Sequence, residues 1–204
     1  GTVDPQKFTK VRNQMLEDSK GDWIMVLDGD EVWWEDSIRS LLSVINENGE
    51  KLDSVVSKYI NLVGDIYHYQ PENAGKYKIK GKEGFLTIRA MNKNRIKGLK
   101  IDKPHGQQGF YDGEGKLIQD RNESAMVFLE KPSFLHFTNL QRSKTRSNDL
   151  KVPKRGFKLK HEIGREFPLN FYYPEVFFKP RLEMVDDVWK KMEEKFYLRS
   201  LLET

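Results

Sequence analysis

Apolar side chains near the start of the chain recur at helical spacing and predict a helix over residues 4–19. Its apolar face repeats at steps of three and four residues: Phe8, Val11 and Met15. Asp4 and Pro5 suit its beginning, because a carboxylate caps free N–H groups and proline has none to satisfy. A second helix is predicted over 36–48, with the buried stripe Ile38, Leu41, Leu42 and Ile45.

Between these helices lies a short, wholly apolar run, residues 23–27 (WIMVL). Its length and branching favour a strand covered on both faces, as in a parallel sheet. The order helix, buried strand, helix is typical of a doubly wound α/β sheet. Later strands, separated by polar turns, are predicted at 53–63, 84–91, 95–99 and 133–137.

The second half of the chain adds a hairpin and a closing helix to this prediction. Asp112-Gly113 lies between residues 108–111 and 116–119, and Asp-Gly between two such segments favours a hairpin turn. A final helix is predicted over 181–202, with one apolar face formed by Val185, Val188, Trp189, Met192 and Phe196.

Composition excludes several classes of protein. The 204 residues, 37% of them hydrophobic, suffice for a core without a metal or disulfide. The absence of cysteine excludes a disulfide framework, a thiolate zinc site and cysteine catalysis. No apolar run approaches 18 residues and the first residues lack the apolar core of a signal peptide, so we expect a cytoplasmic protein.

Charge is mixed along most of the chain, with 35 Lys and Arg against 31 Asp and Glu, so nucleic acid is not expected as a partner. Residues 151–165 are an exception, since this stretch carries six basic residues and one Glu. Two interpretations stay open for it. Neighbouring aromatic residues favour peripheral contact with anionic lipid, whereas such runs are more often solvated charge.

Candidate chemistry concentrates in Asp28-Gly29-Asp30-Glu31, directly after the apolar run. Mutual repulsion of three carboxylates is relieved by a hard divalent cation, which prefers oxygen ligands. Ligands of α/β sheets bind beyond the carboxyl ends of strands, and Gly29 would permit a sharp turn or a close approach. The alternative is a solvated turn in which one Asp caps the next helix.

Three segments, Val11-Arg12-Asn13, Lys20 to Ile24 and Leu27 to Glu31, together resemble the family-2 glycosyltransferases of the GT-A fold. The resemblance implies an α/β fold, a partial GT-A-like mixed sheet flanked by helices with a C-terminal helix. It also implies metal-assisted transfer of a sugar from a nucleoside-diphosphate sugar to a glycan or lipid-linked acceptor. The cofactor implied is divalent Mn or Mg.

By this resemblance, Asp28 lies near the ribose and metal, Asp30 binds the metal that bridges the diphosphate, and Glu31 lines the donor-sugar side. His136, at the end of the predicted strand 133–137, stands where a late histidine completes the metal shell in such enzymes. A core histidine bonded to backbone is the alternative. Arg142, with Lys144 and Arg146, suits a diphosphate clamp or an exposed helix face.

The catalytic base has no clear candidate. Many relatives carry His-Glu where this sequence has His105-Gly106, so Asp102, Asp112 and Asp120 remain candidates, with Asp112 equally suited to form its turn. Trp33 and Trp34 suit either sugar stacking or the core.

Only 27 residues precede Asp28, where the family carries a nucleotide-binding half. We therefore expect residues 1–140 to be the C-terminal portion of a GT-A-like domain and 141–204 to be a basic, helical extension. An open sheet edge would favour self-association or a partner chain. The alternative function is a non-catalytic glycan- or membrane-surface-binding module.

Overall fold

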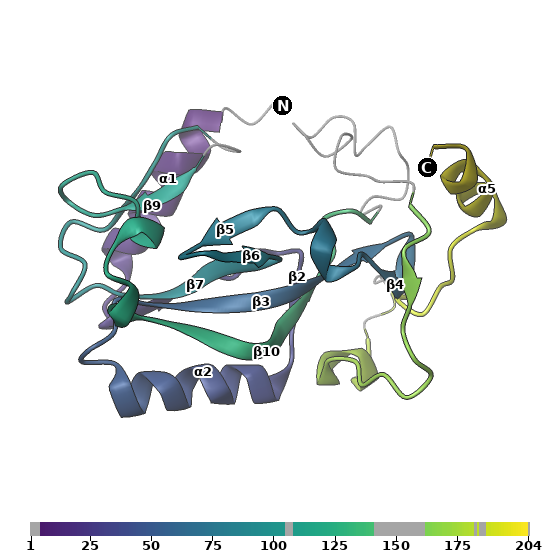
Figure 1. The fold of residues 1–204 in the computed structure, drawn as a ribbon, viewed down its shortest axis with the longest axis horizontal. Helices are drawn as coiled ribbons and strands as arrows, with labels where there is room; N and C mark the ends of the chain where they lie inside the picture. The colour runs from purple at the N-terminus through teal and green to yellow at the C-terminus, as the bar shows by residue number, and fades with distance from the viewer. Residues whose placement is uncertain (1–4, 105–107, 141–161, 182, 184–186, 204) are drawn as a thin grey trace.

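The computed structural model describes residues 5–104, 108–140, 162–181, 183 and 187–203. Its centre is a mixed sheet in the order β1-β7-β3-β10-β2 (Figure 1). The strands are β1 (Trp23–Met25), β7 (Leu86–Asn92), β3 (Ser54–Val63), β10 (Met126–His136) and β2 (Glu31–Trp33). Only the β3–β10 pair is parallel among these described strands; the other three pairs are antiparallel.

The sheet continues beyond β3 through β4 (Asp65–Tyr69), which pairs with β11 (Arg165–Glu166). Two small hairpins accompany it, β5 (Tyr77–Ile79) with β6 (Lys82–Gly84), and β8 (Lys100–Asp102) with β9 (Gly109–Tyr111). The helices are α1 (Pro5–Asp18), α2 (Glu35–Asn48) and the C-terminal α5 (Glu194–Glu203). Short 3-10 turns occupy Glu72–Ala74, Ile118–Asp120, Glu123–Ala125 and Glu175–Phe178. The expected α/β fold with a partial GT-A-like mixed sheet and a C-terminal helix is thereby confirmed.

Strand β3 divides the core into two layers, because alternate side chains of a strand point to opposite faces. Val55 packs with Leu41 of α2 on the face along which this helix runs (Figure 1). Val56 packs on the other face with Ile79 of β5 and Ile118. Both valines are fully buried, so β3 is the strand that is covered on both sides.

The prediction that residues 23–27 form that doubly covered strand in a parallel sheet was wrong. β1 is only three residues long, pairs antiparallel with β7 among the described residues, and leaves Leu27 59% exposed. The reason is topological: β3, rather than β1, lies between two long strands. Apolar run length alone does not distinguish these positions.

The predicted strand 95–99 and the predicted hairpin over 108–119 also differ from the structure. Residues 95–99 form a turn in which Gly98 takes a left-handed φ of 67°, so the strand begins only at Lys100. β9 pairs with β8, and only a single bridge, Tyr111 to Leu117, joins the two sides of the predicted hairpin. Turns with left-handed glycines, Gly98 and Gly115, here override the local apolar pattern.

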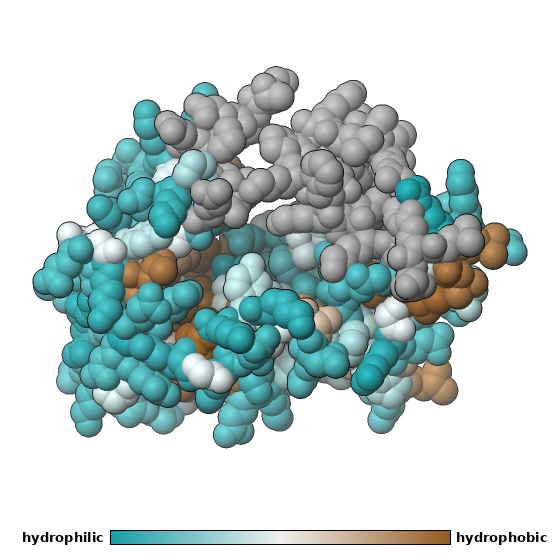
Figure 2. Space-filling model, turned by 45° about the horizontal axis from the view of Figure 1, so that its top comes forward, coloured by the Kyte–Doolittle hydropathy of each residue, from teal (hydrophilic) through white to brown (hydrophobic). Residues whose placement is uncertain are grey.

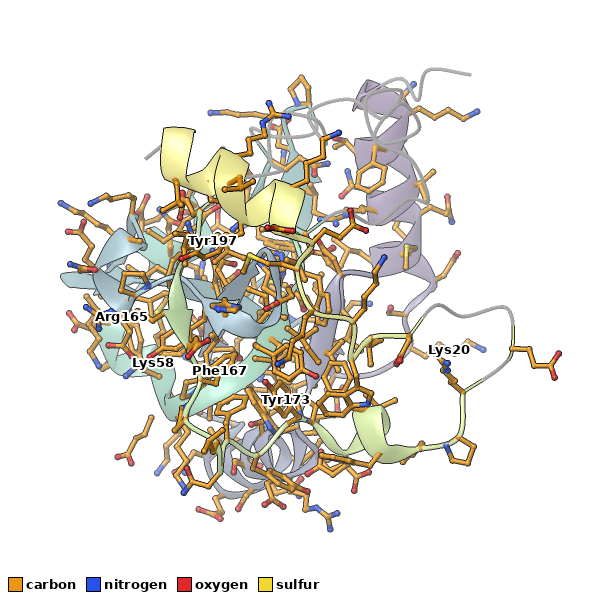
Figure 3. All side chains as sticks on the ribbon, turned by 90° about the vertical axis from the view of Figure 1, so that its right-hand side faces the viewer. Lys20, Lys58, Arg165, Phe167, Tyr173 and Tyr197 are labelled. Carbon is orange, nitrogen blue, oxygen red and sulfur yellow. The ribbon has the colours of Figure 1, made fainter. Side chains whose placement is uncertain are left out.

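The final helix is shorter than predicted: α5 begins at Glu194 rather than near residue 181. Trp189, expected on its apolar face, precedes it and packs on Tyr67 and Tyr173 instead. Val185 lies outside the described residues. Trp189 also contacts Phe177 and Phe178. Phe167 belongs to the same aromatic group, since its ring centre lies 5.9 Å from that of Tyr173; Figure 3 labels both residues.

This aromatic group fixes the described C-terminal residues to the sheet. Tyr173 packs with Leu62 and Leu135, and its hydroxyl donates to the Ile66 carbonyl at 3.1 Å. Burial raises the pKa of Tyr173 to about 12, so the hydroxyl keeps its proton at neutral pH. Figure 2 shows a hydrophobic group at the end that carries α5, where Leu198 and Leu201 are exposed. Within the part of the chain that is described, no helix has the length and apolarity needed to span a bilayer.

Candidate functional site

The acidic residues lie in the turn between β1 and β2. β1, β3 and β10 run in the same direction, because β1 and β3 are both antiparallel to β7 and β10 is parallel to β3. Asp28 and Asp30 follow β1, and His136 ends β10, so they meet at the edge formed by carboxyl ends of strands. Gly29 has open space around its Cα, which leaves that side of the turn accessible. This is the edge at which α/β sheets bind ligands.

Arg12 and Arg89 form ion pairs with Asp28 and Glu31, two of the three carboxylates of this turn. Asp28 accepts from Arg12 of α1 at 2.5 Å and from Arg89 of β7 at 3.2 Å. Arg89 also pairs with Glu31, whose side chain is fully buried. Burial raises the pKa of Glu31, and the nearby Arg89 guanidinium partly opposes that rise. Asp28 and Glu31 are therefore held in place by cations of the protein itself.

Asp30 has a histidine among its partners. Antiparallel pairing of β2 with β10 places His136 opposite Glu31, and the Phe137 N–H donates to the Asp30 carbonyl at 2.8 Å. This register brings the Asp30 Oδ2 atom within 3.5 Å of the His136 Nε2 atom. Their side chains are 12% and 18% exposed, respectively, so both are largely buried but keep some contact with solvent.

The other ring nitrogen of His136 contacts the side-chain oxygen of Asn61, with Nδ1 and Oδ1 2.9 Å apart. An oxygen acceptor there requires a proton on Nδ1. In the neutral ring, Nε2 then presents a lone pair to the Asp30 carboxylate, which is also an acceptor. Two acceptors at this distance repel one another unless a cation, either a proton or a metal ion, lies between them.

These residues fit a divalent metal as a pair rather than as a cluster. Among the described residues, no group of three His, Cys, Asp or Glu side chains forms a potential metal site. Mg²⁺ commonly uses one or two protein ligands and takes the others from phosphates and water. The Asp30–His136 pair supplies two ligand atoms in that pattern. The carboxylate of Asp28 is bound by two guanidinium groups.

Of the remaining candidates, Trp33 reaches the acidic turn, because its indole N–H donates to the Glu31 carboxylate at 3.2 Å. Asp102 and Asp120 are exposed, and Arg142 lies outside the described residues. Trp33 stacks on Phe134 at 4.9 Å between ring centres, and the Trp34 indole N–H donates to the Tyr172 carbonyl. These packing contacts favour the core interpretation of both tryptophans over sugar stacking.

Asp112 is the buried member of the three candidate bases. One carboxylate oxygen accepts from the backbone N–H groups of Glu114 and Lys116, and the other accepts from Arg121 at 2.6 Å. The Lys116 N–H contributes most to lowering the pKa of Asp112 below its usual 3.8, with Arg121 also contributing. Such a carboxylate is a poor proton acceptor and a good turn former.

Asp112→Asn is therefore expected to lower stability at pH 7. Because the folded state favours the ionised carboxylate, its stabilising contribution exists above the unfolded pKa and disappears as pH falls through the lower folded pKa. The difference in melting temperature from the wild type should thus shrink below about pH 4. Thermal unfolding across pH tests this, and a difference that grows on acidification would contradict it.

Sequence reasoning missed Arg89 and Asn61. Arg89 is the single charge in the apolar strand segment LTIRAMN, and its residue is only 9% exposed. A lone charge within an otherwise apolar strand requires a partner of opposite charge. Arg89 was therefore a signal from which a partner in the acidic turn could have been inferred. Asn61 gave no comparable signal, because an uncharged side chain does not require a partner of opposite charge.

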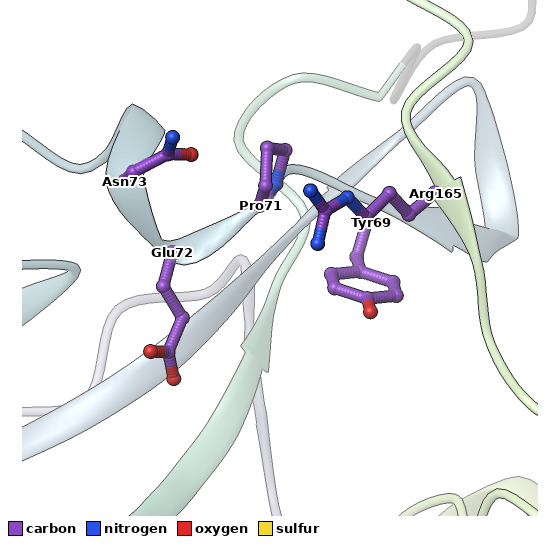
Figure 4. Close-up of a pocket in the computed structure, with 5 residues that line it drawn as sticks. All are labelled: Tyr69, Pro71, Glu72, Asn73 and Arg165. Carbon is purple, nitrogen blue, oxygen red and sulfur yellow. The ribbon is translucent and has the colours of Figure 1, made fainter.

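A separate depression of about 480 Å³ lies beside β4 and β11. Its lining is Tyr69, Pro71, Glu72, Asn73 and Arg165, none of which belongs to the acidic turn. Figure 4 shows Arg165 beside Tyr69, with Glu72 and Asn73 on the turn that follows β4. The chemistry described above therefore lies elsewhere than in this open depression.

An acidic turn, a histidine and two arginines that form three ion pairs thus meet at the carboxyl-end edge of a mixed sheet. In α/β domains this is the edge at which ligands bind. The model of the family "Glycosyl transferase family 2" matches residues 5–107, half of the chain. The chain belongs to that family, whose general reaction is glycosyl transfer. No curated protein and no solved structure gives a significant match.

Proposed function

We propose that the chain carries the diphosphate-binding side of a metal-dependent glycosyltransferase, which moves a sugar from a nucleoside-diphosphate sugar to a glycan or lipid-linked acceptor. The observation that supports this most directly is the Asp30–His136 pair. Its two ligand atoms face each other at 3.5 Å, while the Nδ1 proton of the histidine is occupied by Asn61. Family membership supports the reaction class.

Asp30 and His136 would hold Mn²⁺ or Mg²⁺ together with the diphosphate of the donor. The bound cation supplies Lewis-acid stabilisation of negative charge on the leaving diphosphate. Asp28, held by Arg12 and Arg89, is oriented beside this pair at 29% exposure and can accept a hydrogen bond from a ribose hydroxyl. Glu31 is too deeply buried to touch the donor sugar; it orients Arg89.

Asp102 and Asp120 remain the proposed acceptor-activating bases, because both are exposed carboxylates on the β8–β9 side. Asn13 of α1 binds both the N–H and the carbonyl of Ile101, which ties this hairpin to the helix that supplies Arg12. Asp102 is the better of the two candidates, since it directly follows that attachment.

Contact with a lipid surface is proposed for the C-terminal part. Exposed apolar side chains follow the basic stretch 151–165: Leu169, Tyr172, Val176 and Phe178. They support peripheral binding near a lipid-linked acceptor on the cytoplasmic side. Co-sedimentation with anionic vesicles, but not neutral ones, is expected, and absence of binding to both removes this part of the proposal.

Thermal unfolding with added ligands tests the proposed function. Mn²⁺ together with a nucleoside diphosphate is expected to raise the melting temperature more than either alone, because a ligand that binds the folded state stabilises it. EDTA should reverse the effect. Glycan binding that persists in EDTA, without any stabilisation by Mn²⁺ and nucleotide, would favour a non-catalytic module instead.

A further inference from the structure

We propose that Glu162 fixes the tautomer of His136 from a distance, through the side-chain amides of Gln70 and Asn61. The four side chains form one hydrogen-bonded series, named here the amide relay. Glu162 is a positioning residue in it, rather than a ligand. The consequence for metal binding rests on the proposed function, whereas the tautomer itself does not.

The orientation of each side-chain amide in the relay follows from Glu162, the residue farthest from His136. The Gln70 amide nitrogen donates to the Glu162 carboxylate at 2.7 Å. An ionised carboxylate only accepts hydrogen bonds, so the amide of Gln70 has one permitted orientation, with its nitrogen toward Glu162. Its oxygen must then face the opposite way.

That oxygen accepts from two asparagines. Asn139 donates to the Gln70 Oε1 atom at 3.1 Å, and Asn61 donates to the same atom at 3.3 Å. Both asparagines and Gln70 are at most 7% exposed, so water is not an easy substitute partner. Because the side-chain nitrogen of Asn61 donates to Gln70, its side-chain oxygen faces His136.

His136 is the last residue of the amide relay. Its Nδ1 lies 2.9 Å from the Asn61 oxygen and must carry the proton, which leaves the Nε2 lone pair directed at Asp30. The ring is also packed edge-on against Tyr59 at 5.2 Å, which limits rotation. Outer hydrogen bonds of this kind fix the tautomer and orientation of metal-binding histidines.

Register explains why the relay exists in this fold. Parallel pairing of β3 with β10 places Asn61 beside His136, and the Gln70 N–H donates to the Asn61 carbonyl at 2.9 Å. Asn61 and Gln70 are therefore joined by a backbone hydrogen bond as well as by the bond between their side-chain amides. Glu162 reaches them from the segment that precedes β11, so the C-terminal part of the chain contributes to the site.

Nitrogen-15 NMR of histidine-labelled, metal-free protein tests the proposal at a pH where the rings are neutral. Free histidine prefers the proton on Nε2, so an Nδ1–H tautomer for His136 in the wild type is the expected and diagnostic result. The His136→Gln spectrum assigns the signal. His68 is an internal reference for a proton on Nδ1, because its Nδ1 lies 2.6 Å from Asp65, while its Nε2 lies 3.5 Å from the exposed Glu166.

Glu162→Ala should convert His136 to a mixture of tautomers and weaken Mn²⁺–nucleotide binding about 10-fold, the lower range for loss of an outer partner. Adding Gln70→Glu to that variant restores an acceptor-only group facing Asn61 and should recover the Nδ1–H signal. Backbone amide spectra check that each variant is folded.

Two results would overturn the relay: an Nε2–H tautomer in the wild type, or an unchanged tautomer in Glu162→Ala. Absence of Mn²⁺ binding with the Nδ1–H tautomer intact would instead contradict the proposed metal function and leave the relay supported. The two proposals therefore fail separately.

Discussion

Asp30→Asn is expected to reduce Mn²⁺-dependent binding of a nucleoside diphosphate at least about 100-fold, beyond the range for loss of an outer partner. The amide keeps the size of the side chain but removes the charge that compensates the cation. His136 would then be the one remaining partner of the pair. Isothermal titration calorimetry with Mn²⁺ present measures the change directly.

Asp36→Asn is the matched control for this substitution. Asp36 lies in the first turn of α2, its side chain is 91% exposed, and its contact is a 3.7 Å ion pair with Arg39. Removing its charge changes the net charge equally without touching the acidic turn. Equal affinities for the wild type and Asp30→Asn would contradict the proposed ligand role of Asp30.

Arg89→Met is expected to lower the free energy of unfolding by about 3–5 kcal/mol, because loss of one partner leaves a buried charge uncompensated. The Arg89 side chain is 10% exposed and the Glu31 carboxylate it faces is fully buried. Methionine retains much of the packing against Phe134. Chemical denaturation at neutral pH provides the measurement.

A second substitution separates charge from packing. Glu31→Gln in the Arg89→Met background removes the orphaned carboxylate and should recover a large part of the lost stability, since replacing both partners of a buried pair is often near neutral. Arg39→Met is the surface control, because its pairs on α2 are exposed and should be worth at most about 1 kcal/mol. Similar losses for Arg89→Met and Arg39→Met would show that burial of the Glu31 charge is not the cause.

The first two helices were predictable from their apolar stripes, because that signal is local, whereas the stripe predicted over 181–202 is helical only from Glu194. Leu41 and Ile45 of α2 illustrate this, and the bounds of that helix differ from the prediction by one residue. Strand order was not predictable in the same way. Residues 23–27 are wholly apolar and the longer β3 contains Ser, Lys and Asn, yet long-range pairing makes β3 the central strand.

The candidate site was predictable only where residue types cluster in sequence. Asp28, Asp30 and Glu31 stand out together, but the partners that give each a different role come from distant elements. Arg89 is 58 residues from Glu31 and Asn61 is 75 residues from His136. The register of β3, β7 and β10 creates these contacts, and a sequence pattern does not encode register over such separations.

Pulsed electron paramagnetic resonance of Mn²⁺ bound with a nucleoside diphosphate tests the central claim most directly. In protein labelled with nitrogen-15 histidine, the account predicts a coupling between Mn²⁺ and one imidazole nitrogen, which disappears in His136→Gln and is retained in His68→Gln. Bound Mn²⁺ without a histidine coupling, or a coupling that persists in His136→Gln, would contradict the assignment of the Asp30–His136 pair as the metal site.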